Sequence, residues 1–375
     1  MINSINVRKY RNLDELKIRS LVQVNLITGK NNTGKSTLLE AIAIYTAKSN
    51  LGIISQILEE RGESYRQTPG NKNITESNTK TLSSLFTNRV VSFNHTDSIT
   101  IGPIENTLFG EQNSTEDLVS LRFVKYIDEV IDQSDSIIRR QRKIIEDDRN
   151  NLIDFKVGFE MRVGTNSFLV PLEEERFFRI GFRGSLSTEK FQFIRTRNID
   201  REINGKLWDN ITLTEKEQFV IGALKIIEPL VERIAFIEEG LRYRTAVVKL
   251  SNNNAVFPLQ SMGDGINRIL TIILALVNSD NGILLIDEFE NGLHHSVQEK
   301  LWEIIFNLSF KLNVQVFATT HSEDCISGFQ NILNSPSNSI EGKLIRLDNV
   351  DGKIKQVEFT KNELQIASNK RIEIR

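Results

Sequence analysis

The stretch VNLITGKNNTGKSTLLEAIA, residues 24–43, decides how the whole chain is interpreted. Within it, Gly29 to Ser36 have the form G-x-x-x-x-G-K-[ST], with an apolar strand candidate at 22–28 before them and a helix candidate at 37–48 after them. Glycines let the backbone curl so that successive N–H groups point at phosphate oxygens, and the start of the helix adds partial positive charge. The stretch therefore predicts a nucleotide-binding phosphate loop.

The lysine and the serine of this motif have separate expected roles. Lys35 would reach the β- and γ-phosphates of a nucleoside triphosphate, and the Ser36 hydroxyl would bind Mg²⁺. Backbone and side chains of the loop together would hold the nucleotide. The expected nucleotide-binding residues are Gly29, Lys30, Asn31, Asn32, Thr33, Gly34, Lys35, Ser36 and Thr37.

Composition narrows the class of protein. The chain has 375 residues, 39% hydrophobic and 26% charged, which fits two domains or one α/β unit carrying an insertion. Its net charge of −2 gives no overall basic field that would attract nucleic acid. The single cysteine, Cys325, rules out an internal disulfide and fits a reducing compartment. Because no run approaches the length of a membrane span, we expect a cytoplasmic protein without membrane segments.

The segments around the loop suggest a core with an insertion. Residues 2–28 alternate as short strands, 38–47 and 53–61 have helical patterns, and the polar stretch 63–80 is expected to be a loop. From 89 to 197, short alternating runs predict antiparallel strands. A capping box of Thr214 and Glu217 predicts a helix over 214–228. We therefore expect a core made of 1–88 and 214–375, with an inserted β-rich lobe at 89–213.

A basic cluster lies inside the expected lobe and has two readings. Its members are Arg139, Arg140, Arg142 and Lys143. They could contact nucleic-acid phosphates. The favoured alternative is a solvated hairpin tip or helix face, balanced by the acidic residues at 146–148.

A second group of candidate site residues follows an apolar strand candidate at 282–286. Asp287 and Glu288 stand at its carboxyl end, where ligands bind in open α/β sheets. Adjacent residues of an extended backbone point to opposite sides, so the two carboxylates could do different work. Asp287 is expected to hold Mg²⁺ from its second coordination sphere or through water, and Glu288 to orient and polarise the attacking water as a general base.

Two further segments could take part in the same site. The turn PLQSMGDGINR, residues 258–268, places Ser261, Gly263 and Gly265 at a helix start, where free N–H groups can receive an anion. The strand candidate VQVFATT ends at His321, which could contact a γ-phosphate. Taken alone, either segment could be purely structural. Cys325 is expected to be a packed thiol rather than a nucleophile.

The order of these motifs resembles the ABC-type ATPase heads of the SMC, RecF and OLD superfamily. That order is a phosphate loop, S-x-G-x-G at a helix start, LLIDE, E-N-G-L-H and TTHS. The segments SMGDGINR, LLIDEFENGLH and VFATTHSEDCI are most similar to compact bacterial AAA family ATPases. The resemblance implies an α/β P-loop NTPase with a mixed sheet, ATP and Mg²⁺ as cofactors, and catalytic roles for Lys35, Glu288 and His321.

In such heads, the signature loop of one protomer covers the γ-phosphate held by the other. The resemblance therefore implies a homodimer with ATP sandwiched between two copies. Ser261, Gly263 and Gly265 would act in trans, and residues 290–292 would form the D-loop at the interface.

Two departures limit the resemblance. The signature has SMGDG where transporter-type heads have LSGGQ, and Gln192 and Gln56 are equally weak candidates for the Q-loop glutamine. The residues after His321 are too few for the toprim nuclease domain of OLD proteins. An effector nuclease would then be a separate partner protein encoded nearby.

The leading hypothesis is a Mg²⁺-dependent, ATP-hydrolysing dimeric switch. It would clamp or sense nucleic acid, or control a partner nuclease, in anti-phage defence or DNA repair. The alternatives are the ATP-binding subunit of an ABC transporter and an ATP-gated scaffold with little turnover. The opening INVRKYRNLDELKI, residues 5–18, resembles that of SMC, RecF and OLD-type ATPases, where an aromatic–Arg–Asn turn joins the first two strands. This opening and the nonstandard signature argue against the transporter, and the Asp287–Glu288 pair argues against the scaffold.

Overall fold

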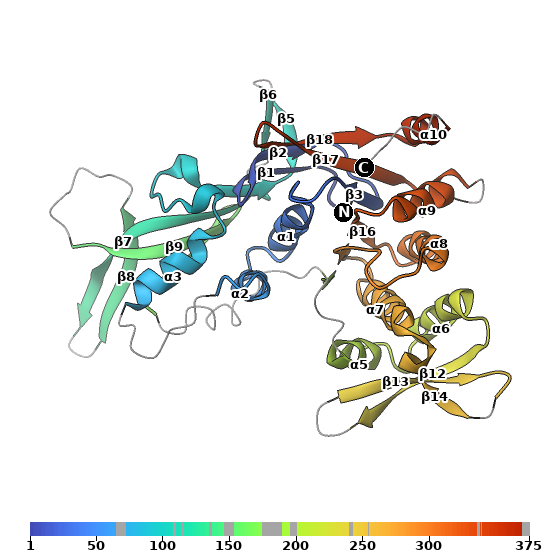
Figure 1. The fold of residues 1–375 in the computed structure, drawn as a ribbon. Helices are drawn as coiled ribbons and strands as arrows, with labels where there is room; N and C mark the ends of the chain where they lie inside the picture. Colours follow the sequence, from blue (N-terminus) through green and yellow to red (C-terminus); the bar gives the residue numbers. More distant parts are fainter. Residues whose placement is uncertain are drawn as a thin grey trace.

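The computed structural model describes most of the chain, and the fold below refers to that part. The described residues are 1–64, 73–107, 110–113, 116–134, 137–145, 154–174, 190–195, 201–239, 243–253, 255–335, 338 and 340–369. Two large β-sheets and a smaller β-sheet are joined by helices (Figure 1). No described helix is both long and apolar enough to cross a membrane.

The central sheet has six strands in the order β11-β15-β16-β3-β17-β18. Neighbouring strands from β11 to β17 are parallel, and β18 pairs antiparallel with β17. The predicted α/β fold with a mixed sheet is therefore confirmed. The strands are β11 (Phe191–Ile194), β15 (Ile283–Ile286), β16 (Gln315–Thr319), β3 (Val24–Thr28), β17 (Gly342–Val350) and β18 (Lys353–Phe359).

The inner strands of this sheet are buried on both faces. In β15, Leu284 and Ile286 belong to one hydrophobic cluster, whereas Ile283 and Leu285 belong to the other. Successive side chains of a strand point to opposite faces, so a sheet covered on both sides needs strands that are apolar throughout. Figure 1 shows helices on either side of the sheet. These are α1 (Lys35–Thr46) on one side and α7 (Asp264–Asn278), α8 (His295–Lys311) and α9 (Glu323–Asn334) on the other.

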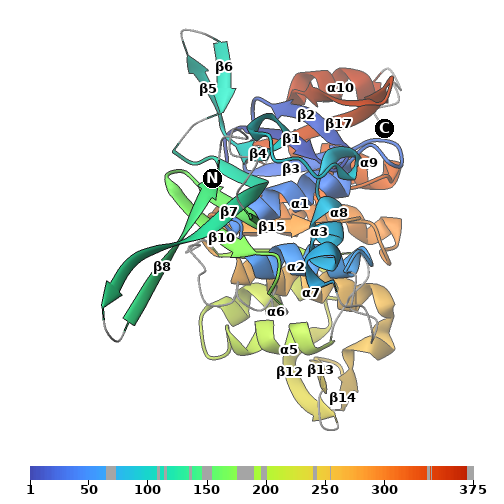
Figure 2. The same cartoon turned by 90° about the vertical axis from the view of Figure 1, so that its left-hand side faces the viewer.

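The second large sheet is antiparallel, with the order β10-β9-β7-β4-β1-β2 and β8 paired to β7. One face packs against α1, α2 (Leu51–Glu60) and α3 (Ile74–Ser83) through the shared hydrophobic cluster. Figure 2 shows the β7–β8 hairpin projecting away from the core. The strands are β1 (Ile5–Tyr10), β2 (Leu13–Ile18), β4 (Ile99–Gly102), β7 (Val119–Ser134), β8 (Ile137–Ile145), β9 (Lys156–Val163) and β10 (Asn166–Pro171).

The antiparallel strands are distributed differently from the sequence prediction. The sheet already begins with β1 and β2, before the phosphate loop, and β4 continues it by pairing with β1. Conversely, β11 pairs in parallel with β15 and so belongs to the central sheet, although it falls within the range 89–213. Its short apolar pattern fits either sheet, and only the pairing distinguishes them. The domain boundaries at 88 and 213 stay a prediction.

Two local expectations are also wrong. The polar stretch 63–80 contains the start of α3, where the Asn73 side chain accepts a hydrogen bond from the Glu76 N–H at 3.2 Å and so caps the helix. Burial of Thr81 and Leu82 holds the other end. The apolar run 90–93 forms no strand, and Val90 and Val91 are exposed.

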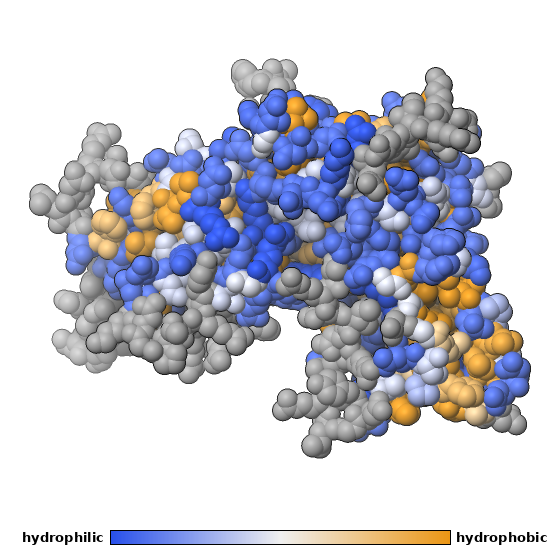
Figure 3. Space-filling view, in the orientation of Figure 1, coloured by the Kyte–Doolittle hydropathy of each residue, from blue (hydrophilic) through white to orange (hydrophobic). Residues whose placement is uncertain are grey.

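The smaller sheet, β12-β13-β14, packs with two helices against α7 and shares the hydrophobic cluster on that side of the central sheet. The predicted helix 214–228 is present as α6, where the Glu217 carboxylate accepts a hydrogen bond from the Leu213 N–H at 2.7 Å. Apolar residues gather on this part in Figure 3, and Ile237 and Val256 are among the exposed ones. The elements are β12 (Val231–Glu239), β13 (Tyr243–Leu250), β14 (Val256–Pro258), α5 (Arg201–Asp209) and α6 (Lys216–Ile227).

The remaining elements lie at the periphery. β5 (Ile104–Thr107) and β6 (Gly110–Asn113) form a two-stranded hairpin. A short C-terminal helix, α10 (Lys361–Asn369), packs near α9. Neither contributes a residue to the site described below.

The basic cluster lies on a strand, β8, rather than on a helix. Arg142 is 3.5 Å from Glu174, and Lys143 is 3.4 Å from Glu129. The side chains of Arg139 and Arg140, and the acidic residues at 146–148, lie outside the described residues. The described half of the cluster is therefore neutralised by acids of the same lobe.

A buried ion pair joins β7 to β9 and allows a test of the lobe's stability. The Glu160 carboxylate, 2% exposed, accepts hydrogen bonds from Arg122 and from the Ser167 hydroxyl, the latter at 2.6 Å. Burial alone would raise the pKa of Glu160, but these bonds outweigh it and hold the pKa below its usual range. Since Glu160 is ionised in the fold, Glu160→Gln would remove the carboxylate charge that pairs with the buried Arg122.

We expect Glu160→Gln to lower the free energy of unfolding by about 3 kcal/mol at pH 7. Because the folded pKa is depressed, this contribution is present above the unfolded pKa of about 4.3 and is lost as the pH falls through the folded pKa. Urea unfolding of both proteins at pH 7 and below pH 4 measures the difference. An equal difference at both pH values would contradict the role of the carboxylate charge.

Candidate functional site

The phosphate loop connects β3 to α1 and depends on two glycines. Gly29 has φ 141°, and a Cβ there would lie 2.3 Å from the Leu347 carbonyl oxygen of β17. Gly34 has φ 87° and stands directly before the first turn of α1. Any other residue at Gly29 would clash with β17, and one at Gly34 would be strained, so both glycines are needed for the loop's shape.

The Lys35 side chain folds back over this loop. Its ammonium donates to the carbonyl oxygens of Gly29 at 2.6 Å and Lys30 at 2.9 Å. The Thr33 hydroxyl closes the same turn by donating to the Lys30 carbonyl at 2.8 Å. The positive charge of Lys35 is thereby held at the loop, where the N-terminus of α1 adds further positive potential.

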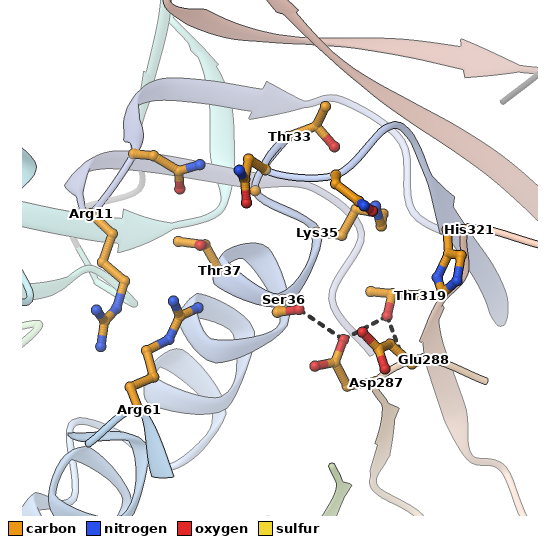
Figure 4. A pocket seen from close by; sticks show the side chains of 14 residues that line it. Arg11, Thr33, Lys35, Ser36, Thr37, Arg61, Asp287, Glu288, Thr319 and His321 are labelled. Atoms are coloured by element: carbon orange, nitrogen blue, oxygen red, sulfur yellow. Dashed lines mark hydrogen bonds between the residues drawn. The ribbon is translucent and has the colours of Figure 1, made fainter. Parts of the chain in front are cut away.

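The motifs at the two ends of the chain meet at one carboxylate. Asp287 follows β15, and its Oδ1 accepts hydrogen bonds from the Ser36 hydroxyl at 3.0 Å and the Thr319 hydroxyl at 2.6 Å (Figure 4). Ser36 and Asp287 are 251 residues apart in sequence. A hydroxyl and a carboxylate oxygen at this separation are the hard oxygen donors that Mg²⁺ prefers. The donor set therefore fits a magnesium ion, which Ser36 and Asp287 would hold.

Glu288 departs from the extended conformation expected for it. Its φ is 47°, in the left-handed region, and its N–H donates to the Thr319 hydroxyl at 2.9 Å. The chain therefore turns immediately after Asp287. As a result Asp287 and Glu288 line the same cavity instead of pointing to opposite sides. The expectation of opposite sides assumed an extended backbone at both residues, whereas β15 ends at Ile286 and Glu288 is left-handed.

The cavity at this junction has a volume of about 790 Å³, large enough for a nucleotide. An adjoining cavity of about 460 Å³ shares Ser36, Arg61, Asp287 and Glu288 with it. The larger cavity is lined by Arg11, Asn12, Asn31, Asn32, Thr33, Gly34, Lys35, Ser36, Thr37, Arg61, Asp287, Glu288, Thr319 and His321.

His321 reaches the cavity from the end of β16 and is oriented by Glu290. The Glu290 carboxylate lies 2.8 Å from His321 Nδ1 and accepts from the His321 N–H at 2.9 Å and the Thr320 hydroxyl at 2.7 Å. With Nδ1–H donated to this carboxylate, Nε2 is free to contact a ligand. Glu290, expected at a protomer interface, is thus engaged within its own chain, whereas Asn291 and Gly292 are exposed.

The expected signature residues do not line the cavity in their own chain. Ser261 and Gly263 are exposed on the short turn before α7, and the Ser261 hydroxyl donates to the Pro258 carbonyl at 2.7 Å. A Cβ on Gly265 would lie 2.9 Å from the Gly292 carbonyl oxygen, so α7 begins in close contact with the turn after Glu288. The structure brings together the phosphate loop, Asp287, Glu288 and His321, and leaves Ser261 and Gly263 on the surface.

Several residues that line the site were not assigned a role in it from the sequence. Arg11 and Asn12, in the turn after β1, line the cavity, and Arg11 lies 3.2 Å from the buried Glu40 of α1. Arg61 also contacts Glu40, at 2.7 Å. Thr319 is hydrogen-bonded to both Asp287 and Glu288 and stands two residues before His321. In this motif, only the histidine was predicted to belong to the site. The local sequence does not mark these residues as part of the site, because tertiary contacts bring them there.

The two Q-loop candidates lie elsewhere. Gln192 is paired with Leu284 inside the sheet, and Gln56 donates to Glu60 at 3.0 Å on the surface of α2. Neither lines the two cavities at this junction. The residue that follows β11 and lines the smaller cavity is Arg195, which is paired with Glu60 and lies over the Phe193 ring.

Cys325 is fully buried in α9, and burial raises the pKa of its thiol well above the usual range. Its carbonyl oxygen accepts from the Trp302 indole at 3.1 Å. Such a thiol is protonated at neutral pH and packs as a small apolar group.

A family model described as "AAA domain, putative AbiEii toxin, Type IV TA system" matches residues 24–324. The chain belongs to this AAA family. The match spans the phosphate loop, Asp287, Glu288 and His321. The protein is therefore an ATPase, as the motif order indicated.

Relatives and solved structures agree with this AAA family assignment. An "ATP/GTP phosphatase" of Helicobacter pylori is 22% identical over 368 residues, covering 94% of this chain and 93% of the relative. The "DNA replication and repair protein RecF" of Rickettsia typhi is 23% identical over 374 residues, covering 88% and 97%. The structure titled "Crystal structure of the SmcHead bound to the C-winged helix domain of ScpA" is 13% identical with a TM-score of 0.50, covering 96% of this chain and 99% of that one. The predicted membership of the SMC/RecF-like ABC-type superfamily is confirmed.

Proposed function

We propose that the protein is a Mg²⁺-dependent ATPase that works as a homodimeric switch, with ATP held between two copies. The observation that carries this proposal is the contact between Ser36 and Asp287 at 3.0 Å, in a cavity that also contains Lys35 and Glu288. A triphosphate in the phosphate loop would place its γ-phosphate beside Glu288.

Each residue of the junction has a distinct role in the proposed hydrolysis. The loop N–H groups and the Lys35 ammonium would bind the β- and γ-phosphates and stabilise the charge that develops on them. Glu288 would accept the proton of the attacking water, and His321 Nε2 would contact the γ-phosphate. Ser36 and Asp287 would hold Mg²⁺, which when bound neutralises charge on the phosphate oxygens.

The homodimer is proposed because the site is incomplete in one chain. Ser261 and Gly263 present an anion-receptive helix start on the surface, away from the cavity of their own chain. In a two-fold arrangement, the same turn of each copy could face the phosphate loop of the other. ATP would then join the two copies, and its hydrolysis would release them.

Mixing two inactive variants tests this arrangement. Lys35→Ala removes the phosphate grip, and Ser261→Arg blocks the exposed signature turn, so each variant alone should lack activity. In a mixed dimer, one site combines an intact Lys35 with the intact Ser261 of the other copy. An equimolar mixture should recover about a quarter of wild-type phosphate release, since half of the dimers have one complete site.

The control for this experiment is Ser251→Arg, which changes another exposed serine, directly after β13. It should retain wild-type activity. If the equimolar mixture stays inactive while Ser251→Arg is active, the trans arrangement is wrong.

We further propose that the switch acts on nucleic acid or on a partner effector such as a nuclease. The support is the family description, which names a toxin and a type IV TA system, and the RecF relative, whose name refers to DNA replication and repair. The neutralised Arg142 and Lys143 give no support to a nucleic-acid contact at the basic cluster. Comparing DNA affinity with and without ATP separates the two roles, because only a nucleic-acid clamp would gain affinity.

A further inference from the structure

Arg268 is a buried arginine on the second turn of α7, immediately after the signature turn. Only 1% of it is exposed. Its guanidinium donates to the carbonyl oxygens of Asp287 at 2.9 Å, Glu288 at 3.3 Å and Arg195 at 3.0 Å. One side chain of α7 thus holds the backbone at the ends of both β15 and β11.

Burying this charge is costly. Burial lowers the pKa of Arg268, although the charges of Asp287, Glu288 and Glu290 partly oppose the shift. In the described part of the chain its hydrogen-bond acceptors are carbonyl oxygens rather than carboxylates. A packed apolar side chain at such a position is often as stable as a charged one or more so. The guanidinium is therefore better explained by the geometry it imposes than by the stability it gives.

That geometry concerns Glu288 above all. A glutamate in the left-handed region is strained by about 1 kcal/mol or more, and it keeps this conformation only when its surroundings fix it. Its N–H is bound by Thr319 at 2.9 Å, and its carbonyl accepts from the Asn291 N–H at 3.0 Å and from Arg268. Thr319 belongs to β16 and Asn291 to the turn that follows Glu288, so Arg268 is the one of these three that comes from a helix, α7.

We propose that Arg268 is a positioning residue for hydrolysis, which sets the backbone of Asp287 and Glu288 and couples it to the Ser261–Gly265 turn. The proposal rests on the role of Glu288 in the proposed function. α7 begins at Asp264, so Arg268 lies one helical turn from that end. Contact of the turn with a second copy's γ-phosphate would be transmitted along this rigid helix to the general base. The close approach of Gly265 to the Gly292 carbonyl is a second link between the same two segments.

The test compares Arg268→Met, Arg268→Lys and a control, Arg122→Met. Arg268→Met should lower kcat about 10- to 100-fold, because small displacements of a general base have effects of this size. The dissociation constant for ATP should stay within about twofold, since Arg268 does not line the nucleotide cavity. Arg268→Lys keeps a charged donor that can reach one or two of the carbonyls, and should recover part of kcat.

Arg122 is a matched control because it is another buried arginine, 6% exposed, that forms a charged pair in the lobe. Arg122→Met should lower the melting temperature but keep kcat when assayed well below it. If Arg268→Met fails to fold, Arg268→Lys decides. A kcat for Arg268→Lys equal to wild type, or a loss of kcat in Arg122→Met as large as in the Arg268 variants, would overturn the proposal.

A double-mutant cycle with Ser261→Ala tests the coupling itself. If Arg268 transmits the engagement of the signature turn, Ser261→Ala should reduce kcat much less in the Arg268→Lys background than in wild type. Additive effects would overturn the coupling. Failure of the proposed function is distinguishable, because it would show as unimpaired hydrolysis by Glu288→Gln, whereas failure of this inference would show only in the Arg268 variants.

Discussion

Replacing Glu288 by glutamine is expected to lower kcat for ATP hydrolysis about 1000-fold, which is within the range measured for loss of a general base. Glutamine keeps the size of the side chain and the left-handed backbone at 288, but it cannot accept the proton of the attacking water. ATP affinity should change by no more than about twofold, because Lys35, Ser36 and Asp287 are intact. Phosphate release and equilibrium binding of ATP measure the two quantities.

The same variant should accumulate as an ATP-bound dimer. Hydrolysis is the step that releases the two copies in the proposed cycle, so a protein that binds ATP without cutting it stays associated. Light scattering after gel filtration with Mg²⁺ and ATP would show the doubled mass. Glu303→Gln, an exposed glutamate on α8, is the control and should behave as wild type. If Glu288→Gln hydrolyses ATP normally, Glu288 is not the base. If wild type also fails to release phosphate, the scaffold alternative gains.

Replacing Lys35 by alanine is expected to weaken ATP binding about 100-fold, because hydrogen bonds from a charged donor contribute about 1.5–3 kcal/mol each. The loss should be larger for ATP than for ADP, since Lys35 would reach the γ- as well as the β-phosphate. Isothermal titration with each nucleotide in the presence of Mg²⁺ measures both affinities.

The control for Lys35 is Lys48→Ala, which removes a lysine just beyond the other end of α1. Lys48 lies over the Tyr45 ring and 3.5 Å from Asp117, away from the cavity. It should bind ATP as wild type does. Equal ATP affinity in wild type and Lys35→Ala would remove the phosphate loop from the mechanism.

The sequence predicted those parts of the fold that depend on local pattern. The strand, glycine turn and helix around Gly29 and Gly34 follow from a short motif and the patterns that flank it, and the composition of the apolar run before Asp287 predicted a strand buried on both faces. The membership of β11 in the central sheet could not be predicted, because strand pairing is a tertiary property. The helix α3 was missed because its polar sequence is stabilised by the Asn73 cap and by burial of Leu82 rather than by an apolar stripe.

In the candidate site, too, the sequence located the residues of short motifs but not the features that depend on tertiary contacts. Lys35, Ser36, Asp287 and Glu288 could be located because their chemistry requires fixed spacings within short motifs. The turn at Glu288 could not, since it is imposed by Thr319 and Arg268 from other elements. Arg268 is recognisable in the sequence as the only basic residue of the apolar helix α7. A lone arginine among leucines and isoleucines indicates a buried partner, but not which one.

The pairing of β11 with β15 limits how this protein could be remodelled. The Asp287 N–H donates to the Ile194 carbonyl at 2.8 Å, so Asp287 is hydrogen-bonded to the segment that follows the antiparallel strands in the chain. A chimera in which a foreign recognition module replaced those antiparallel strands would have to keep residues 190–195. Replacing these residues as well would remove β11, the strand that pairs with β15, and leave the edge of β15 open to water.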